Sequence, residues 1–394
     1  MAQFKLVMDE ALKYFIGKDV QKLLKRKDSD AGDSTRALGE LRSSFISEFR
    51  TAEGAKRQQQ RFCGPWIALS FNFVVAVAII LTNKLLLGKV GFNFPIALTI
   101  VHYVVSWIFM AILNTLSLIP GAPASKTPLA SLVALGVIMS FASGLANVSL
   151  KYNSVGFYQM AKISVTPTIV FTEWALFRKR ISFQKALSLA VVSIGVAIAT
   201  VTDLEFNPFG AMVALAWILP SAANKILWST LQQRDNWTAL ALMWSTTPLT
   251  VLSLVALMPC LDPPGLLSFS WSLTNTVAIF ISAIFGFFLQ WSGALALGAT
   301  CATTHVVLGQ FKTCVILLGG FLLFEANPGA KSLCGATMAL SGMAMYTFLT
   351  LQLEGNNETS GRQVLHKQVG LSNLRPHNRG NKLCVGENQV SELV

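Results

Sequence analysis

Residues 155–180 read VGFYQMAKISVTPTIVFTEWALFRKR, a mostly apolar run that is long enough to cross a bilayer and ends in a basic cluster. Lys162 lies inside this run. A lysine in the middle of a spanning helix costs about 2.5–3.5 kcal/mol on insertion scales, so we expect it to face the protein interior or a water-filled cavity. At helical spacing Tyr158, Lys162 and Thr166 share one face, and Gln159 lies next to Tyr158. The stretch therefore predicts one wall of an anion-binding cavity.

The composition of the chain is that of a polytopic membrane protein. Of its 394 residues, 53% are hydrophobic and only 13% are charged, which is too apolar for a globular protein of this size. Much of the net charge of +12 lies in polar termini and loops, where membrane orientation accounts for basic residues, so we expect no nucleic-acid partner. The six cysteines show no metal-like spacing, and neither a metal nor a cofactor is expected.

Ten apolar segments of spanning length predict an all-α fold with ten transmembrane helices. They lie at about 66–87, 95–118, 129–149, 155–177, 185–202, 208–231, 238–258, 274–297, 300–324 and 331–353. An even number of spans puts both termini on one side of the membrane. If that side is the cytosol, its short loops hold most of the basic loop residues, as the positive-inside rule requires (Lys126, Arg178, Lys179, Arg180, Lys185 and Arg234). We therefore predict that both termini are cytosolic.

Two correspondences along the chain indicate an internal repeat. The triplet Asn83-Lys84-Leu85 ends the first segment, and Asn224-Lys225-Ile226 lies late in the sixth. Lys162 lies in the fourth segment, and Lys312 takes a matching position in the ninth. Both pairs relate segment n to segment n+5, so each half has five spans and the second half is inverted. Inverted repeats are typical of alternating-access carriers, whose substrate site lies near the middle of the membrane between the repeats.

The predicted organisation has four parts. A polar N-terminal arm, two five-helix repeats and a polar C-terminal tail follow one another (residues 1–62, 63–203, 204–353 and 354–394). Within the arm, residues 4–27 carry apolar side chains at helical intervals, which fits either an amphipathic helix on the membrane or a solvated helix. The arm contains nine acidic residues, unlike an organelle transit peptide, so a plastid location is disfavoured.

The two lysines within the fourth and ninth segments, Lys162 and Lys312, have no evident acidic partner. Glu173 and Glu325 lie eleven and thirteen residues further along the same segments, about 16–20 Å away by helical rise. This excludes an ion pair within one helix and leaves an ion pair between helices as the alternative. A phosphate or diphosphate would supply the two negative charges that the lysines require, and Thr313 adds a hydroxyl beside Lys312.

Three further polar residues within apolar segments are candidates for substrate binding. Lys225 belongs to the repeated triplet, but a lysine near a helix end also commonly reaches the membrane surface, and Lys84 has the same alternative. Asn147 and Gln290 fit the lining of a cavity, or hydrogen bonds that hold membrane helices together.

Four features occur together in this chain: ten spans, the run YQMAK at 158–162, the basic end RKR at 178–180 and the Lys312-Thr313 pair. In this combination residues 66–353 resemble the plant nucleotide-sugar transporters of the drug/metabolite transporter superfamily. They are most similar to the subgroup that is named for its Lys-Thr pair.

Two stretches, NSVGFYQM at 153–160 and ATVTDL at 199–204, most resemble the UDP-xylose branch and less closely the UDP-rhamnose/UDP-galactose branch. The resemblance implies antiport of a cytosolic UDP-sugar against lumenal UMP across a Golgi membrane, with the endoplasmic reticulum as the alternative. It also implies that Lys162 and Lys312 contact the phosphates of the nucleotide. The expected partners are this small-molecule substrate and membrane lipid, and a homodimer is left open.

The main alternative is a phosphate or phosphorylated-metabolite antiporter of the plastid translocator type. Those translocators share the lysine of the fourth segment but place Lys-Arg where this chain has Lys312-Thr313. A guanidinium suits a small, highly charged ligand, whereas a hydroxyl suits a larger ligand that carries a sugar. A membrane scaffold or receptor would gain nothing from buried cations. An enzyme is least expected, because the spans contain no paired carboxylates, metal cluster or nucleophile with a base.

Overall fold

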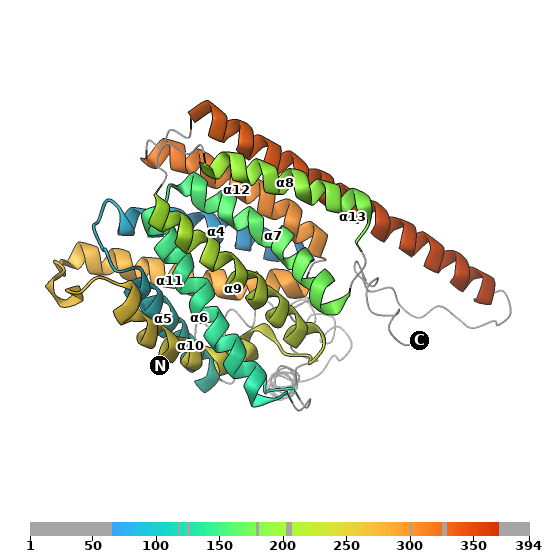
Figure 1. The fold of residues 1–394 in the computed structure, drawn as a ribbon. Helices are drawn as coiled ribbons and strands as arrows, with labels where there is room; N and C mark the ends of the chain where they lie inside the picture. Colours follow the sequence, from blue (N-terminus) through green and yellow to red (C-terminus); the bar gives the residue numbers. More distant parts are fainter. Residues whose placement is uncertain are drawn as a thin grey trace, which may run out of the picture.

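The computed structural model describes residues 65–116, 119–123, 127–178, 181–201, 207–299, 302–324 and 329–369. These residues form ten α-helices and one short 3₁₀ helix (Figure 1). In chain order the elements are α4 (Pro65–Leu87), α5 (Pro95–Thr115), α6 (Leu129–Tyr152), α7 (Val155–Phe177), α8 (Phe183–Val201), α9 (Pro208–Gln233), α10 (Ala239–Leu261), η1 (Leu266–Ser268), α11 (Leu273–Ala299), α12 (Ala302–Phe324) and α13 (Gly329–Val369). The N-terminal arm, with its predicted amphipathic helix, lies outside the described residues.

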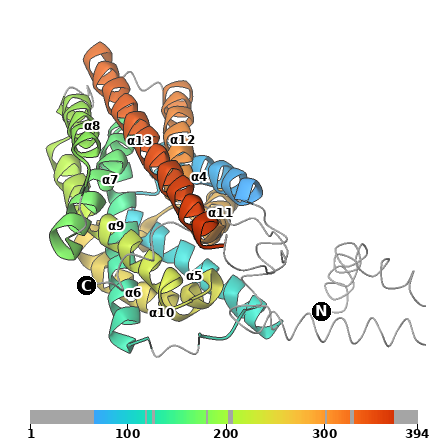
Figure 2. The same ribbon diagram turned by 90° about the vertical axis from the view of Figure 1, so that its right-hand side faces the viewer.

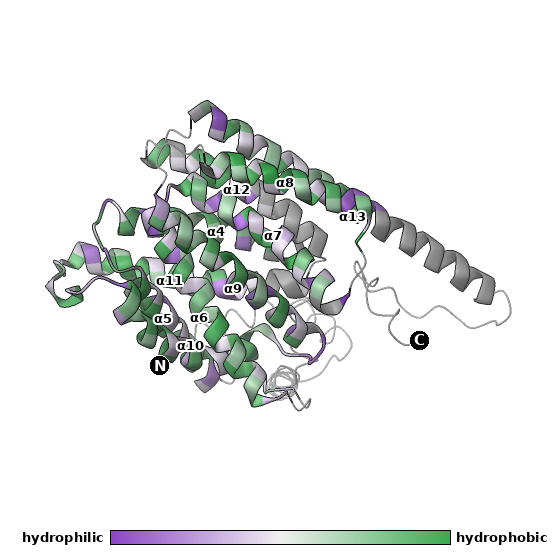
Figure 3. Cartoon of the chain, viewed as in Figure 1, coloured by the Kyte–Doolittle hydropathy of each residue, from purple (hydrophilic) through white to green (hydrophobic). Residues whose placement is uncertain are grey.

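These helices confirm the predicted all-α membrane fold. By length and composition, eight of them contain a described stretch that can cross a membrane (α4, α5, α6, α8, α9, α10, α11 and α13). The other two, α7 and α12, carry Lys162 and Lys312, and their crossing of the membrane stays a prediction. Hydrophobic side chains dominate the helices (Figure 3), and some are widely exposed, such as Leu215 at 70% and Leu252 at 68%. So much exposed apolar surface is expected against lipid and not against water.

Local sequence signals determine where several helices begin. Pro95 and Pro208 take the first position of α5 and α9, where the N–H that proline lacks has no partner within the helix. Ser154 caps α7, because its Oγ accepts a hydrogen bond of 3.0 Å from the backbone N–H of Phe157. As a result α7 begins and ends at the predicted residues, and the helix continues through Pro167.

The last helix, α13, departs most from the predicted boundaries. The predicted segment ended at residue 353, whereas the helix continues to Val369, because no proline interrupts it before that point. Its first part packs along α8 (Figures 1 and 2), and its last part extends beyond the other helices (Figure 1). The predicted tail therefore begins inside this helix.

The contact between α8 and α13 depends on small residues. A Cβ atom at Gly195 of α8 would lie 2.5 Å from the backbone nitrogen of Ala339 on α13. A Cβ atom at Gly335 of α13 would in turn meet the backbone nitrogen of Ala199 on α8. Only glycine leaves room for two helix backbones at such a distance.

The helix contacts occur in matching sets. The α6–α9 contact has a counterpart in α4–α11, and the α7–α9 contact has one in α4–α12. In the same way α7–α8 corresponds to α12–α13, and α6–α10 corresponds to α5–α11. Three further contacts, α5–α10, α7–α12 and α8–α13, each join a helix to the one five places later.

Asp262 connects α10 to α5 at one end of the bundle. It follows the last residue of α10, and its two carboxylate oxygens accept hydrogen bonds of 2.9 and 2.7 Å from the backbone N–H groups of Ile96 and Ala97. These are orphan donors of the first turn of α5, so Asp262 caps that helix from another element. Partial burial raises the pKa of the Asp262 carboxyl, and the two N–H donors offset only part of this effect.

Candidate functional site

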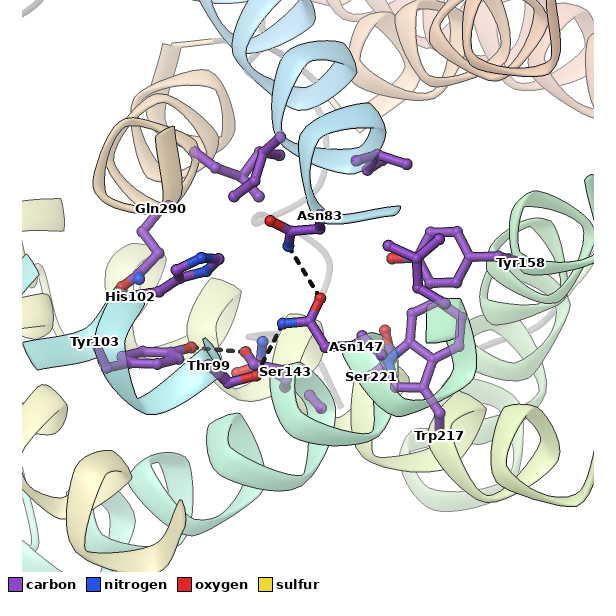
Figure 4. A pocket seen from close by; sticks show the side chains of 18 residues that line it. Asn83, Thr99, His102, Tyr103, Ser143, Asn147, Tyr158, Trp217, Ser221 and Gln290 are labelled. Carbon is purple, nitrogen blue, oxygen red and sulfur yellow. Dashed lines mark hydrogen bonds between the residues drawn. The ribbon is translucent and has the colours of Figure 1, made fainter. Parts of the chain in front are cut away.

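A cavity of about 210 Å³ lies between α4, α5, α6, α7, α9 and α11 (Figure 4). Its polar and aromatic lining residues are Asn83, Thr99, His102, Tyr103, Ser143, Asn147, Tyr158, Trp217, Ser221, Asn224 and Gln290. None of the lining residues is a lysine, arginine, aspartate or glutamate. We refer to this space as the neutral cavity.

Asn147 lies in the middle of the polar wall of the neutral cavity and is held on both sides (Figure 4). Its Nδ2 donates to Thr99 Oγ1 at 2.8 Å, and its Oδ1 accepts from Asn83 Nδ2 at 3.1 Å. Asn83 Oδ1 in turn accepts a hydrogen bond of 2.6 Å from Ser282 Oγ. These bonds join α4, α5, α6 and α11 and fix the amide orientations, so this part of the wall is rigid.

His102 on α5 extends the same network, and its tautomer follows from the bonds around it. Ser282 donates its only proton to Asn83, so its oxygen must accept from His102 Nε2 at 2.9 Å. His102 Nε2 therefore carries a proton. Its other ring nitrogen faces α11, where a Cβ at Gly286 would lie 3.2 Å from Nδ1. The ring is thus held in place by hydrogen bonding and packing.

Two stacked aromatic rings form the opposite wall of the neutral cavity (Figure 4). The ring centroids of Tyr158 and Trp217 are 5.2 Å apart, with 15° between the ring planes. Tyr158 was predicted from the sequence, and Trp217 was not. The signal that indicates Trp217 is its spacing, since Trp217, Ser221 and Asn224 lie at i, i+4 and i+7 and share one face of α9.

Two buried acceptors on the cavity wall have no partner among the described residues, Asn224 Oδ1 and Gln290 Oε1. The orientation of the Gln290 amide is determined by its neighbours. Its Nε2 donates to Ser106 Oγ at 3.3 Å, and that hydroxyl gives its own proton to the His102 carbonyl at 2.7 Å. A buried acceptor without a partner costs about 1–3 kcal/mol. A ligand that donates hydrogen bonds would remove this cost.

Three lysines, Lys162 on α7, Lys225 on α9 and Lys312 on α12, lie near one another. Lys162 and Lys312 are partly buried and Lys225 is exposed, and the three lie close enough together for their positive charges to repel one another. No carboxylate in the described part of the chain pairs with any of the three. We refer to these residues as the lysine cluster. Like charges without an acid favour the arrival of an anion.

Lys312 connects the lysine cluster to α4 and α11 through hydrogen bonds. Its Nζ donates to Asn72 Oδ1 on α4, and Asn72 Nδ2 donates to Ser292 Oγ on α11 at 3.1 Å. Sequence reasoning missed Asn72, although an asparagine within an apolar segment is itself a signal. The contact joins α12 to α4 and orients the ammonium group.

Two predicted residues are buried outside the neutral cavity. Gln159 is fully buried, and neither polar atom of its amide has a partner among the described residues. It lies one turn from Lys162 on α7, so the unpaired amide is close in sequence to the lysine cluster. The hydroxyl of Thr313 donates to the carbonyl of Gly309 on its own helix at 3.0 Å. In this structure the hydroxyl therefore serves α12 itself.

The predicted site residues thus fall into three groups. Tyr158, Asn147 and Gln290 line the neutral cavity. Lys162, Lys225 and Lys312 form the lysine cluster and do not line that cavity. Gln159 and Thr313 are buried and do not line the cavity, and each lies on the same helix as one lysine of the cluster.

Lys84, the counterpart of Lys225 in the repeated triplet, caps a helix. Its Nζ donates to the carbonyls of Leu150 and Asn153 at 3.0 and 2.6 Å, at the end of α6. A lysine at this position stabilises the last carbonyls of a helix. The two triplet lysines therefore have different surroundings.

The fold and the site define a polytopic α-helical membrane protein with a polar, partly cationic interior. The chain belongs to the Triose-phosphate Transporter family, whose model matches residues 64–347. The family resemblance drawn from the sequence is thereby confirmed.

Individual relatives show how similarity is distributed along the chain. The chain is 66% identical to "Nucleotide-sugar uncharacterized transporter 2" of Arabidopsis thaliana over 358 residues, 91% of this chain and 90% of the relative. It is 59% identical to "Nucleotide-sugar uncharacterized transporter 1" of the same organism, over 92% and 94% of the two chains. It is 32% identical to the Arabidopsis "UDP-xylose transporter 2", over 71% and 80%. The UDP-xylose branch is therefore more distant, and the similarity to the first two relatives extends into the polar ends.

Proposed function

We propose that this protein is a nucleotide-sugar antiporter that exchanges a cytosolic UDP-sugar for lumenal UMP by alternating access. Its relatives support this proposal, because their names describe nucleotide-sugar, UDP-xylose and UDP-rhamnose/UDP-galactose transporters. The same relatives make the plastid phosphate-translocator alternative less favoured. In this proposal the membrane is that of the Golgi and both termini are cytosolic.

The observation that carries the proposal is the lysine cluster. Two partly buried cations, Lys162 and Lys312, and the exposed Lys225 repel one another, and no described carboxylate neutralises them. Neighbouring charges of one sign are unfavourable until an opposite charge binds, and a nucleoside diphosphate brings about two negative charges. Lys162 and Lys312 bind the phosphates, and Lys225 adds to the attraction. Gln159 supplies an amide that pairs when the substrate or a second conformation reaches it.

The helix contacts support an inverted-repeat mechanism. Residues 63–203 and 204–353 form the two halves, and helix n of the first half corresponds to helix n+5 of the second. Each contact in the sets described above maps onto a counterpart, or onto itself, under this exchange. Two halves of this kind rock about a shared central site. In the lysine cluster, Lys162 belongs to the first half, and Lys225 and Lys312 belong to the second.

The test is exchange by the full-length protein in proteoliposomes. Vesicles that contain UMP are expected to take up labelled UDP-galactose or UDP-xylose, and vesicles without internal nucleotide are not. Uptake that does not depend on internal UMP would contradict antiport. Faster exchange of inorganic phosphate or triose phosphate would instead favour the translocator alternative.

A further inference from the structure

We propose that the neutral cavity holds the sugar ring of the nucleotide sugar, and that it accepts uncharged sugars and excludes uronic acids. This inference rests on the proposed function, because it requires the phosphates to lie at the lysine cluster. It specifies the class of sugar that the protein carries.

The neutral cavity lies beside the lysine cluster along two helices. On α7, Tyr158 of the cavity and Lys162 of the cluster are one turn apart, about 6 Å by helical rise. On α9, Asn224 of the cavity precedes Lys225 of the cluster. A diphosphate at the lysines can therefore direct the group attached to it into the cavity.

The size of the cavity suits one ring and not a whole nucleotide sugar. Its volume is about 210 Å³. Pockets that enclose a drug-sized ligand typically measure about 300–1,000 Å³. The cavity therefore takes one end of the substrate, either the sugar or the nucleobase.

The chemistry of the walls favours the sugar. One wall presents the stacked rings of Tyr158 and Trp217, and the other presents amide and hydroxyl groups (Figure 4). A pyranose has an apolar face of C–H groups and a rim of hydroxyls, so it matches an aromatic surface opposite a polar one. A uracil ring has two flat faces and only one N–H donor once it is joined to ribose.

The unpaired acceptor oxygens in the cavity favour a neutral sugar over a uronic acid. Asn224 Oδ1 and Gln290 Oε1 need hydrogen-bond donors, and a sugar hydroxyl can donate to either. A carboxylate only accepts, so a uronic acid would leave these oxygens unpaired. It would also bury its charge in a space whose lining residues include no lysine or arginine.

His102 is the one imidazole among the lining residues, and both of its ring nitrogens are occupied within the protein. Its Nε2–H is used by Ser282, and its Nδ1 packs against α11 at Gly286. A carboxylate in the cavity would therefore find no free cationic donor on this side chain.

The experiment uses substrate pairs that differ only at C6. Proteoliposomes of the full-length protein exchange labelled UMP for internal UMP, and each nucleotide sugar is added as a competitor. UDP-galactose and UDP-glucose are expected to compete at concentrations at least ten-fold lower than UDP-galacturonate and UDP-glucuronate. Equal competition within both pairs, or a preference for the acids, would overturn the inference. Failure of every UDP-sugar to compete, or absence of UMP exchange, would reject the proposed function itself.

A variant with a new charge provides an independent test. Gln290→Arg places a guanidinium in the cavity and should improve competition by UDP-galacturonate relative to UDP-galactose at least ten-fold. Gln290→Met, of similar length and without charge, should not change this ratio in favour of the acid. If the arginine variant does not fold, Ser221→Lys makes the same test from α9. A change in the preference for UDP-glucose over GDP-glucose, with an unchanged sugar ratio, would assign the cavity to the nucleobase and contradict the proposal.

Discussion

Replacing Lys162 or Lys312 by alanine is expected to reduce the exchange of UMP for a UDP-sugar at least 100-fold. In the proposed site each ammonium group would supply a charge-assisted hydrogen bond to phosphate, and losing a bond of this kind typically costs about 2–5 kcal/mol. A 100-fold loss corresponds to about 2.7 kcal/mol, which lies within that range. The measurement is the initial rate of uptake into UMP-loaded proteoliposomes.

Stability without ligand distinguishes the two variants. Lys162→Ala removes one of three mutually repelling charges, so its thermal unfolding midpoint in detergent should stay constant or rise. Lys312→Ala relieves the same repulsion but also removes the hydrogen bond to the buried Asn72, so its midpoint should be lower than that of Lys162→Ala. In both variants the increase in the midpoint on adding UDP should largely disappear. This combination separates loss of a ligand contact from loss of the fold.

Lys331→Ala is the matched control for both measurements. Lys331 is an exposed lysine near the start of α13 and is outside the lysine cluster. Its removal is expected to change neither the exchange rate nor the response to UDP. Wild-type exchange by both Lys162→Ala and Lys312→Ala would exclude these two lysines as phosphate ligands.

Gly335→Ala is expected to destabilise the bundle strongly, although alanine is the better helix former. The added Cβ would meet the backbone of Ala199 on α8, which cannot move aside as a side chain can. Overpacking of this kind costs about 1–3 kcal/mol, and a larger residue such as valine should prevent accumulation of the folded protein. Thermal unfolding in detergent and the yield of monodisperse protein measure the effect.

Gly309→Ala on α12 makes the same chemical change where there is room for it. No described atom lies within 4 Å of a Cβ built at this position. Alanine should then add its helix preference, about 0.8–1 kcal/mol, and raise the unfolding midpoint. If the two alanine variants change the midpoint in the same direction, the close contact between α8 and α13 is not what requires glycine.

The fold was largely predictable from the sequence, because a membrane imposes a simple rule on it. Every spanning segment must satisfy its own backbone and be apolar over about 20 residues, so each span appears as a separate run. Nine of the ten predicted segments end within a few residues of the observed helices. The exception is α13, since the end of an apolar run does not end a helix whose next residues contain no proline.

The cationic part of the site was predictable for a similar physical reason. A lysine within an apolar run is too costly to be left against lipid, so Lys162 and Lys312 were evident without coordinates. The proximity of Lys225 to Lys162 and Lys312 was not evident, because a lysine late in a span can equally reach the membrane surface. The structure brings the three together from α7, α9 and α12.

The neutral cavity was predictable only in part. Its walls come from six helices, α4 to α7 together with the more distant α9 and α11, and periodicity identifies a polar face without showing what the face meets. Asn147 was therefore ambiguous between lining a cavity and joining helices, and the structure shows that it does both. Trp217 and His102 were missed, because aromatic residues and a single histidine in an apolar segment are ordinary core residues.

The most direct test of the account is whether binding depends on phosphate, since the lysine cluster is proposed to hold the phosphates of the substrate. Isothermal titration of the purified protein with UMP and with uridine compares two ligands that differ only in this group. The account predicts measurable binding of UMP that weakens with added salt, and at least 100-fold weaker binding of uridine. Equal affinity for the two ligands would contradict it.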